Sequence, residues 1–199
     1  MITTDVVVLL FGGRRLPRPL AGLAAERVDG PDDIDAVVGR ARRLIVVGSD
    51  ADLAALLTRL LRTDRLDVEV GHAAGWRMAR RARRGTARRM PLIRDETGHV
   101  ITGSAEWRGE NGAALRGEAV VDDTRLFDGE VTGVRIEPTL AMPGLRATVT
   151  GKGRRRWVAG RATQLGTTGA LVIRDGVLAP RSVRRSTFYR HTEGWLLVR

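Results

Sequence analysis

The hydrophobic pattern of this 199-residue chain changes near Pro91, and this change limits the folds open to it. Before Pro91, short runs rich in Val and Leu alternate with segments whose apolar residues recur every three or four positions. After Pro91, short runs of alternating polarity are separated by glycines, and no helical stripe is present. The first pattern favours a parallel sheet with right-handed crossovers, and the second favours a sandwich or barrel of short strands.

The first part of the chain, residues 1–90, is therefore predicted to be an α/β domain with a parallel sheet. We expect buried strands at residues 6–11, 44–47 and 68–70, and helices over residues 31–41, 50–62 and 73–84. The second part, residues 91–199, is predicted to be an all-β domain, either a sandwich or a partly open barrel. Its last strand is expected at Trp195–Val198.

Several classes of protein are excluded by what the chain lacks. It has no cysteine, which rules out disulfides, a thiolate nucleophile and cysteine-bound zinc. No apolar run approaches 18 residues, and Asp5 stands before the first apolar run where a signal peptide carries basic residues, so we expect a cytoplasmic protein without a transmembrane segment. His72, His99 and His191 have no metal-ligand spacing, and the sequence predicts no metal site.

The charge is strongly one-sided: 34 basic residues against 23 acidic ones give a net charge of +11. A chain this basic attracts phosphates, acidic lipids and nucleic acid. Within the third predicted helix, one face carries four arginines at helical spacing, namely Arg77, Arg80, Arg81 and Arg84. This face is either a solvated surface or a binding face for phosphate groups, for an acidic lipid surface or for nucleic acid. No specific nucleic-acid motif is present. A second basic run, Gly151 to Arg156, is predicted to be a hairpin tip.

Two loops follow predicted strands at positions where open α/β sheets bind ligands. The first is Gly48-Ser49-Asp50-Ala51-Asp52, and the second is Ala73-Ala74-Gly75-Trp76-Arg77. Amide groups at the start of the helix after each loop can hold a phosphate. The first loop also fits a plain turn in which Ser49 or Asp50 caps the following helix.

These loops resemble the motifs of the diacylglycerol kinase-like superfamily, which includes sphingosine kinases and, more distantly, NAD kinases. The first loop lies at the position of the family's GGDGT motif and the second at its GTGND-like loop, with Met78-Ala79-Arg80 at the following FAR. The stretch from Val172 through Asp175-Gly176 to Val198 is similar to the end of the family's β-rich second domain. The resemblance implies a two-domain kinase-like fold that uses ATP and Mg²⁺, and it implies a homodimer. It implies catalytic candidates at Asp50 and at a later Asp in an Asp-Gly pair, for which Asp175 and also Asp128 qualify. It implies ligand contacts at Gly48, Ser49, Asp50, Gly75, Arg77 and Arg80.

The first motif departs from the family pattern where phosphate would approach the backbone. Ser49 and Ala51 stand where the family has glycine, and Asp52 stands where it has Thr. The added side chains narrow the loop, and a carboxylate repels phosphate. The second motif also changes, since Trp76 and Arg77 stand where the family has Asn and Asp.

The chain therefore resembles a shortened, degenerate member of the superfamily. We expect it to be non-catalytic and to bind an anionic or phosphorylated ligand. One alternative is an active lipid kinase that uses Mg²⁺-ATP, with Asp50 positioning the nucleotide or the metal. The other is a basic adaptor that binds an acidic lipid surface or nucleic acid.

Overall fold

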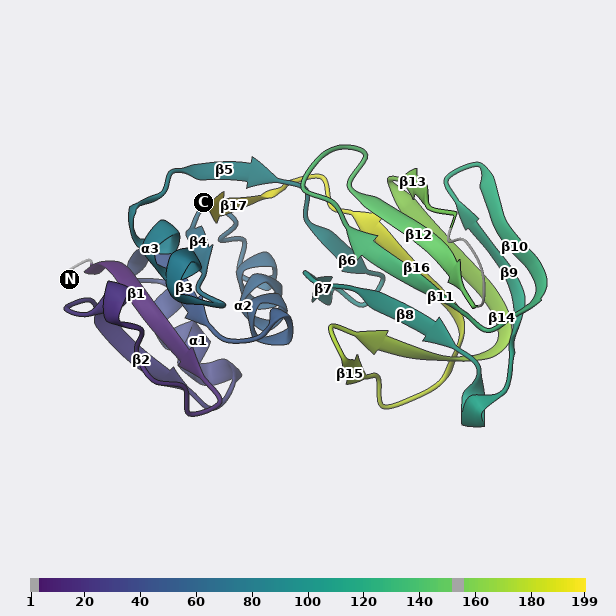
Figure 1. The fold of residues 1–199 in the computed structure, drawn as a ribbon, viewed down its shortest axis with the longest axis horizontal. Coiled ribbons are helices and arrows are strands. Elements are labelled where there is room, and N and C mark those ends of the chain that lie inside the picture. Colours follow the sequence, from purple (N-terminus) through teal and green to yellow (C-terminus); the bar gives the residue numbers. More distant parts are fainter. Residues whose placement is uncertain (1–3, 152–155) are drawn as a thin grey trace. The chain divides into compact units, whose positions relative to one another are not determined.

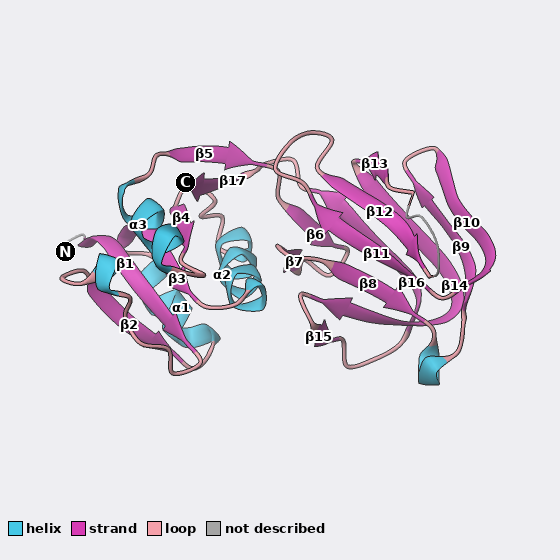
Figure 2. Ribbon diagram, in the orientation of Figure 1, coloured by secondary structure: helices cyan, strands magenta, loops and turns pink. Residues whose placement is uncertain are grey.

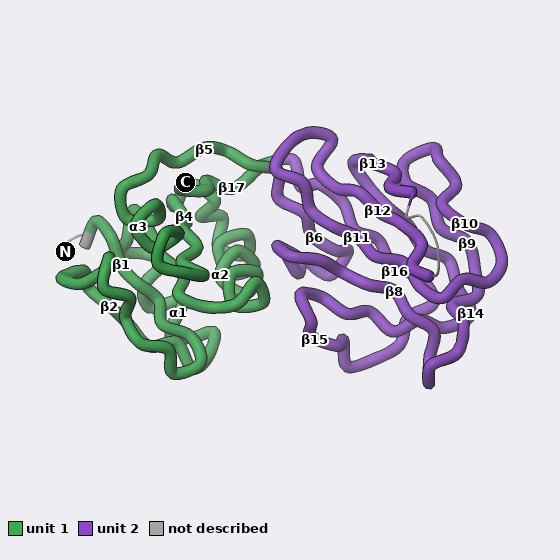
Figure 3. Tube along the Cα trace, in the orientation of Figure 1, with its two compact units in different colours: residues 1–90, 193–199 green, residues 91–192 purple. Residues whose placement is uncertain are grey.

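The computed structural model describes residues 4–151 and 156–199 (Figure 1). The chain divides into two compact units, residues 1–90 with 193–199 and residues 91–192 (Figure 3). The basic run from Gly151 to Arg156, predicted to be a hairpin tip, lies mostly outside the described residues. The last seven residues return to the first unit, although their position in the sequence predicted that they belong to the second domain.

The first unit is built on a six-stranded sheet with the order β2-β1-β3-β4-β17-β5. Every neighbouring pair in it is parallel except β17 with β5, which is antiparallel. The strands are β1 (Thr4–Phe11), β2 (Ala24–Val28), β3 (Ala41–Val47), β4 (Glu69–His72), β5 (Ala87–Met90) and β17 (Trp195–Val198). β17 belongs to this sheet and not to the second domain, because its apolar residues fill the position between β4 and β5. β2 is missing from the sequence prediction because only Val28 among its five residues is buried.

Among its described residues, the first unit also contains three α-helices and one short 3-10 helix (Figure 2). They are α1 (Pro31–Val38), α2 (Asp50–Arg62), α3 (Trp76–Arg84) and η1 (Arg18–Leu20). α1 and α2 pack against each other, while α3 packs against β4 and η1. α3 begins at Trp76, three residues later than predicted. Beneath α3 and η1 lies an apolar cluster that includes Val8, Leu20 and Ile45.

The second unit contains only antiparallel strand pairs among its described residues (Figure 2). Its central strand is β14 (Ala162–Arg174), which pairs with β9 and β16 through its first half and with β8 through its second half. A register shift between Gly166 and Ala170 separates the two halves. The other strands are β6 (Ile93–Asp95), β7 (Val100–Ile101), β8 (Ala105–Arg108), β9 (Leu115–Val121), β10 (Thr124–Val131), β11 (Gly133–Pro138), β12 (Leu145–Thr150), β13 (Val158–Gly160), β15 (Val177–Leu178) and β16 (Val183–Arg190), with the short helix η2 (Glu110–Gly112) before β9.

The core of the second unit forms around two fully buried aromatic rings, Trp107 on β8 and Phe188 on β16. Their centroids are 5.9 Å apart, and the Trp107 indole N–H donates to the buried Ser186 hydroxyl (3.0 Å). Burying both rings removes a large apolar area from water, while the hydrogen bond satisfies the one polar atom of the indole. The predicted fold class, an α/β half with a parallel sheet followed by an all-β half, is confirmed. In the part of the chain that the structure describes, no helix has the length and apolar character that a membrane crossing requires.

Candidate functional site

The loop between β3 and α2 is the first candidate site. β3 reaches it as a run of buried apolar residues, and Ser49 is the N-cap of α2. The Ser49 hydroxyl oxygen accepts a hydrogen bond from the Asp52 N–H (3.3 Å). In return, Asp52 Oδ2 accepts from the Ser49 N–H (2.7 Å) and from the Ser49 hydroxyl (2.8 Å). The two residues thus form a capping box at the start of α2.

The Asp52 carboxylate lies directly against Gly48. A Cβ atom at Gly48 would come within 2.7 Å of Asp52 Cβ and of Asp52 Oδ2. The Ser49 N–H at the start of α2 donates to this carboxylate and is therefore not available to a phosphate. A phosphate charge about 4 Å from Asp52 would be repelled by roughly 1 kcal/mol in water and by more where water is excluded. With Asp52 in this position, the loop is a helix cap and presents a negative charge to incoming phosphate.

Asp50 stands beside this cap with more than half of its side chain exposed. The Nδ1 atom of His72 lies 3.9 Å from Asp50 Oδ1. His72 is the last residue of β4, and its Nε2 lies 3.1 Å from the Gly48 carbonyl oxygen. β3 and β4 are parallel neighbours, and the Ala73 N–H donates to Val46 O (2.8 Å) just past the end of the ladder. The two predicted loops are therefore adjacent at the carboxyl edge of the sheet.

The second loop leads into α3, which is held closely against the sheet. Its buried residues are Ala79 and Ala82, and a Cβ atom at Gly71 of β4 would lie 2.6 Å from the Ala82 Cβ. Only glycine at position 71 permits this approach. At the far side of the helix, the Arg83 guanidinium donates to the Pro19 carbonyl oxygen (2.8 Å) beside η1. α3 is thus fixed on one side by small residues and on the other by an arginine.

The C-terminal end of α3 is capped by Arg43, a nearly buried residue of β3. Its Nη1 donates to the carbonyl oxygens of Ala82 (3.3 Å) and Arg83 (3.0 Å), and its Nη2 donates to Gly85 O (3.2 Å). Its Nε donates to Glu69 Oε2 (2.7 Å) on β4. The guanidinium therefore satisfies carbonyl groups that a helix end leaves without partners, and its charge is balanced by one carboxylate.

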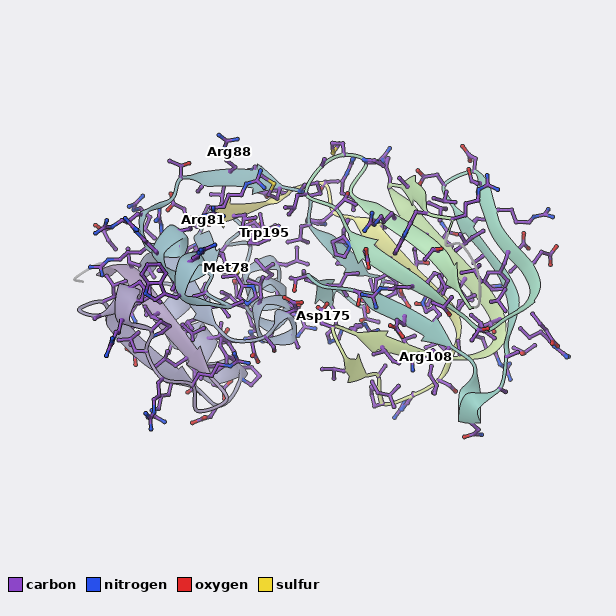
Figure 4. The ribbon with its side chains drawn as sticks, viewed as in Figure 1. Met78, Arg81, Arg88, Arg108, Asp175 and Trp195 are labelled. Carbon is purple, nitrogen blue, oxygen red and sulfur yellow. The ribbon has the colours of Figure 1, made fainter. Side chains whose placement is uncertain are left out.

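The outer face of α3 forms a basic groove of about 520 Å³, which we name the α3 groove. It is lined by Trp76, Arg77, Arg80, Arg81, Arg84, Gly85 and Arg199. The four helix arginines are exposed, and none of them forms an ion pair within residues 4–151 and 156–199. Residues 70–94 contain eight arginines and no acidic residue, so the sequence immediately around α3 is strongly basic. Figure 4 labels Arg81 and Met78 on this helix and Arg88 on β5.

Gly75 and Gly85 bracket α3 and serve it in different ways. Gly75 is the exposed N-cap residue in extended backbone, and among the described residues no side chain caps the N-terminus of α3. A Cβ atom at Gly85 would lie 2.7 Å from the Arg199 carbonyl oxygen, so glycine is needed where the chain after β17 passes the helix end. This close approach brings Arg199 to the α3 groove.

Asp175, the second catalytic candidate, lies in the second unit, in the turn between β14 and β15. Its carboxylate accepts hydrogen bonds from three consecutive backbone N–H groups, those of Thr102 (3.0 Å), Gly103 (2.7 Å) and Ser104 (2.9 Å). Its own backbone is left-handed, with φ 48°, as an Asp-Gly turn allows. This geometry joins the turn to the loop before β8.

Other acidic groups of the second unit are also bound within the fold. Asp95 is fully buried and pairs with Arg174 (2.6 Å), and Asp122 accepts from the Arg161 and Ala162 N–H groups (2.9 Å each). Among the residues that the structure describes, no three His, Cys, Asp or Glu side chains form a group that could hold a metal ion.

The parallel-sheet unit, the loop at the carboxyl edge of β3 and the antiparallel second unit together define a class, the two-unit fold of the NAD kinase-like and diacylglycerol kinase-like proteins. The chain is similar to a diacylglycerol kinase from Bacillus anthracis, with a TM-score of 0.74 and 10% identity over 98% of this chain and 96% of that one. It is also similar to an NAD kinase from Archaeoglobus fulgidus solved in complex with ATP, with a TM-score of 0.66 and 11% identity over 98% of this chain and 93% of that one. A scan against protein-family models and a search of curated proteins found no match. At these identities the likeness shows the fold.

Sequence reasoning missed three features of this region. The capping role of Asp52 could have been found, because a Ser with an acidic residue three positions later is a helix-start signal. The roles of Arg43 and Arg199 could not have been found, because strand pairing alone brings β3 and the end of the chain next to α3. Among the predicted ligand contacts, Gly48, Ser49 and Asp50 lie at the first loop, and Gly75, Arg77 and Arg80 lie at α3.

Proposed function

We propose that this chain is a non-catalytic protein with a kinase-like fold that binds an anionic, phosphorylated ligand. The observation that carries the first half of the proposal is the Asp52 carboxylate bound to the Ser49 N–H at 2.7 Å. A kinase loop must offer its amides to the phosphates of the nucleotide, whereas here the chain's own carboxylate takes the amide. The unpaired arginines of α3 support the second half, because they retain positive charge on an exposed face.

The non-catalytic half is tested by phosphate transfer. The purified chain is incubated with Mg²⁺ and γ-labelled ATP, with diacylglycerol in mixed micelles in one arm and NAD⁺ in the other. We expect no labelled product above the level of a protein-free control. Transfer that the Asp50→Asn variant abolishes would establish the active Mg²⁺-ATP kinase instead and would refute the proposal.

A second experiment tests whether Asp52 is the cause. The variant Ser49→Gly with Ala51→Gly and Asp52→Thr restores the residues that the resembled motif carries. It loses the capping box, which costs about 1 kcal/mol of stability. The backbone N–H of residue 49 then has no carboxylate as its partner. We expect Mg²⁺-ATP to perturb the NMR amide signals of residues 48–52 in this variant and not in the original chain. Perturbation of these signals in the original chain would contradict the claim that the Asp52 carboxylate keeps ATP from this loop.

The binding half is tested by thermal unfolding in the presence of inorganic phosphate, pyrophosphate and tripolyphosphate. A ligand at 100 times its dissociation constant stabilises the folded chain by about 2.7 kcal/mol. We expect stabilisation that grows with the number of phosphate groups. No stabilisation by any of the three would remove this half of the proposal and leave the first half standing.

A further inference from the structure

The α3 groove combines uncompensated charge with a rigid support. Its four helix arginines lie on a helix whose inner face is packed at Gly71 and whose C-terminal end is capped by Arg43. Two acidic residues elsewhere in this unit pair with arginines outside the groove: Glu26 pairs with Arg40, and Asp35 pairs with Arg59. A ligand that binds the groove therefore meets arginines on a fixed backbone and displaces no internal ion pair.

The spacing of these arginines divides them into two pairs. Arg77 and Arg80 are three residues apart, as are Arg81 and Arg84, so the members of each pair lie side by side on the helix. The second pair follows the first by four residues, which is about 6 Å along the axis. Two guanidinium groups can surround one phosphate with parallel N–H donors, and each pair can take one phosphate.

Trp76 adds an apolar element at the N-terminal end of the same groove. Its side chain is 60% exposed, although tryptophan usually buries most of its ring. An exposed ring beside four guanidinium groups offers a flat apolar surface to the part of a ligand that joins its phosphates. The groove, at about 520 Å³, has the size of a site for a small molecule.

We infer that the α3 groove binds a ligand with two phosphate groups about one helical turn apart, one held by Arg77 and Arg80 and the other by Arg81 and Arg84. This inference rests on the proposed function and places its ligand on the arginines of α3 rather than at the loop of residues 48–52. The two phosphates can belong to a soluble compound or to the headgroup of a bisphosphorylated lipid. The shared chemistry is a pair of phosphates on a compact scaffold.

The test compares tripolyphosphate with inorganic phosphate by isothermal titration calorimetry on the full chain. We expect tripolyphosphate to bind at least tenfold more tightly, because it can engage both arginine pairs. The variant Arg77→Gln with Arg81→Gln removes one arginine from each pair and should weaken tripolyphosphate binding by about tenfold for each arginine removed. Equal affinity for the two probes would overturn the inference.

A matched control removes the same charge elsewhere on this unit. Arg27 and Arg62 are exposed, and Arg27→Gln with Arg62→Gln should leave tripolyphosphate binding within about twofold of the original chain, a change caused only by net charge. If the control loses as much affinity as the groove variant, binding is spread over the surface and the groove is refuted, while phosphate binding itself stands. Both variants should keep the original unfolding temperature, because these side chains lie on the surface.

Vesicles and an oligonucleotide distinguish the sources of the phosphates. One set of vesicles carries phosphatidylinositol bisphosphate, and a second set carries phosphatidylserine at equal surface charge. If the chain prefers the first set and the groove variant loses this preference, the phosphates belong to a lipid headgroup. If the chain binds tripolyphosphate but neither set of vesicles, the ligand is a soluble compound. Equal binding to both sets, or tighter binding of single-stranded DNA than of every bisphosphorylated probe, would overturn the inference in favour of a general polyanion surface.

Discussion

Replacing Arg43 by Met should destabilise the first unit more than any exposed arginine substitution. The Met side chain keeps the packed stem of Arg43 but removes the guanidinium that pairs with Glu69 and donates to three carbonyl groups at the end of α3. Removing one partner of a buried ion pair costs about 3–5 kcal/mol. Arg42 lies 3.5 Å from the other oxygen of Glu69 and compensates in part, so we expect about 3 kcal/mol.

The measurement is urea and thermal unfolding of the full chain, with hydrogen exchange of individual amides. For a unit of roughly 100 residues, 3 kcal/mol corresponds to a fall in unfolding temperature of about 12 °C or more. The amide of Gly85, which donates to Arg81 O at the helix end, should lose protection earlier than the amides of α2. The exposed neighbour supplies the control, since Arg42→Met should cost less than about 1 kcal/mol. If the two variants unfold within 1 kcal/mol of each other, the cap does not stabilise α3 and the reasoning fails.

The second unit offers two further tests. Asp175→Ala should destabilise it by about 3 kcal/mol, because three backbone N–H groups lose a charged acceptor. Asp128→Ala, at an exposed Asp-Gly pair that lies inside β10 and not in a turn, should cost less than about 1 kcal/mol. Equal losses in thermal unfolding would contradict the stabilising role of the Asp175 carboxylate. Burial by itself would raise the pKa of Glu137, but hydrogen bonds and charges from Arg135 and Arg146 outweigh it and hold this pKa below 4.5. Because the pKa of Glu137 is lowered in the folded chain, its ionised form adds stability that is fully present above pH 4.5. This stability is lost as the pH falls from 4.5 through the lower pKa of the folded chain. Glu137→Gln should therefore flatten the acid side of the stability curve from urea unfolding, and an unchanged slope below pH 4.5 would argue against it.

Local patterns predicted much of the first unit. The apolar run of β3, the leucine stripe of α2 and the Pro31 helix start each have a period or a punctuation that sequence alone displays. β2 lacks such a period, because an edge strand with four exposed residues carries almost no burial signal. The strand at Trp195–Val198 was predicted correctly as a strand but placed in the wrong sheet, since its partners are chosen by the space left between β4 and β5.

The candidate site followed a similar division. The sequence showed a carboxylate at Asp52 and four arginines at helical spacing, and both are properties of residue order. The orientation of Asp52 toward the Ser49 N–H depends on side-chain geometry at the helix start, although the spacing of the two residues already favours it.

By itself, the sequence determined the fold class, the excess of positive charge and the positions of the two loops, because each depends on short-range periodicity or composition. Only the tertiary structure decided that α3 rests on Gly71, that Arg43 caps it from β3, and that Arg199 joins its groove after β17. These contacts join residues far apart in the sequence. They are selected by how the strands pair and how closely the backbones approach, which no local pattern encodes.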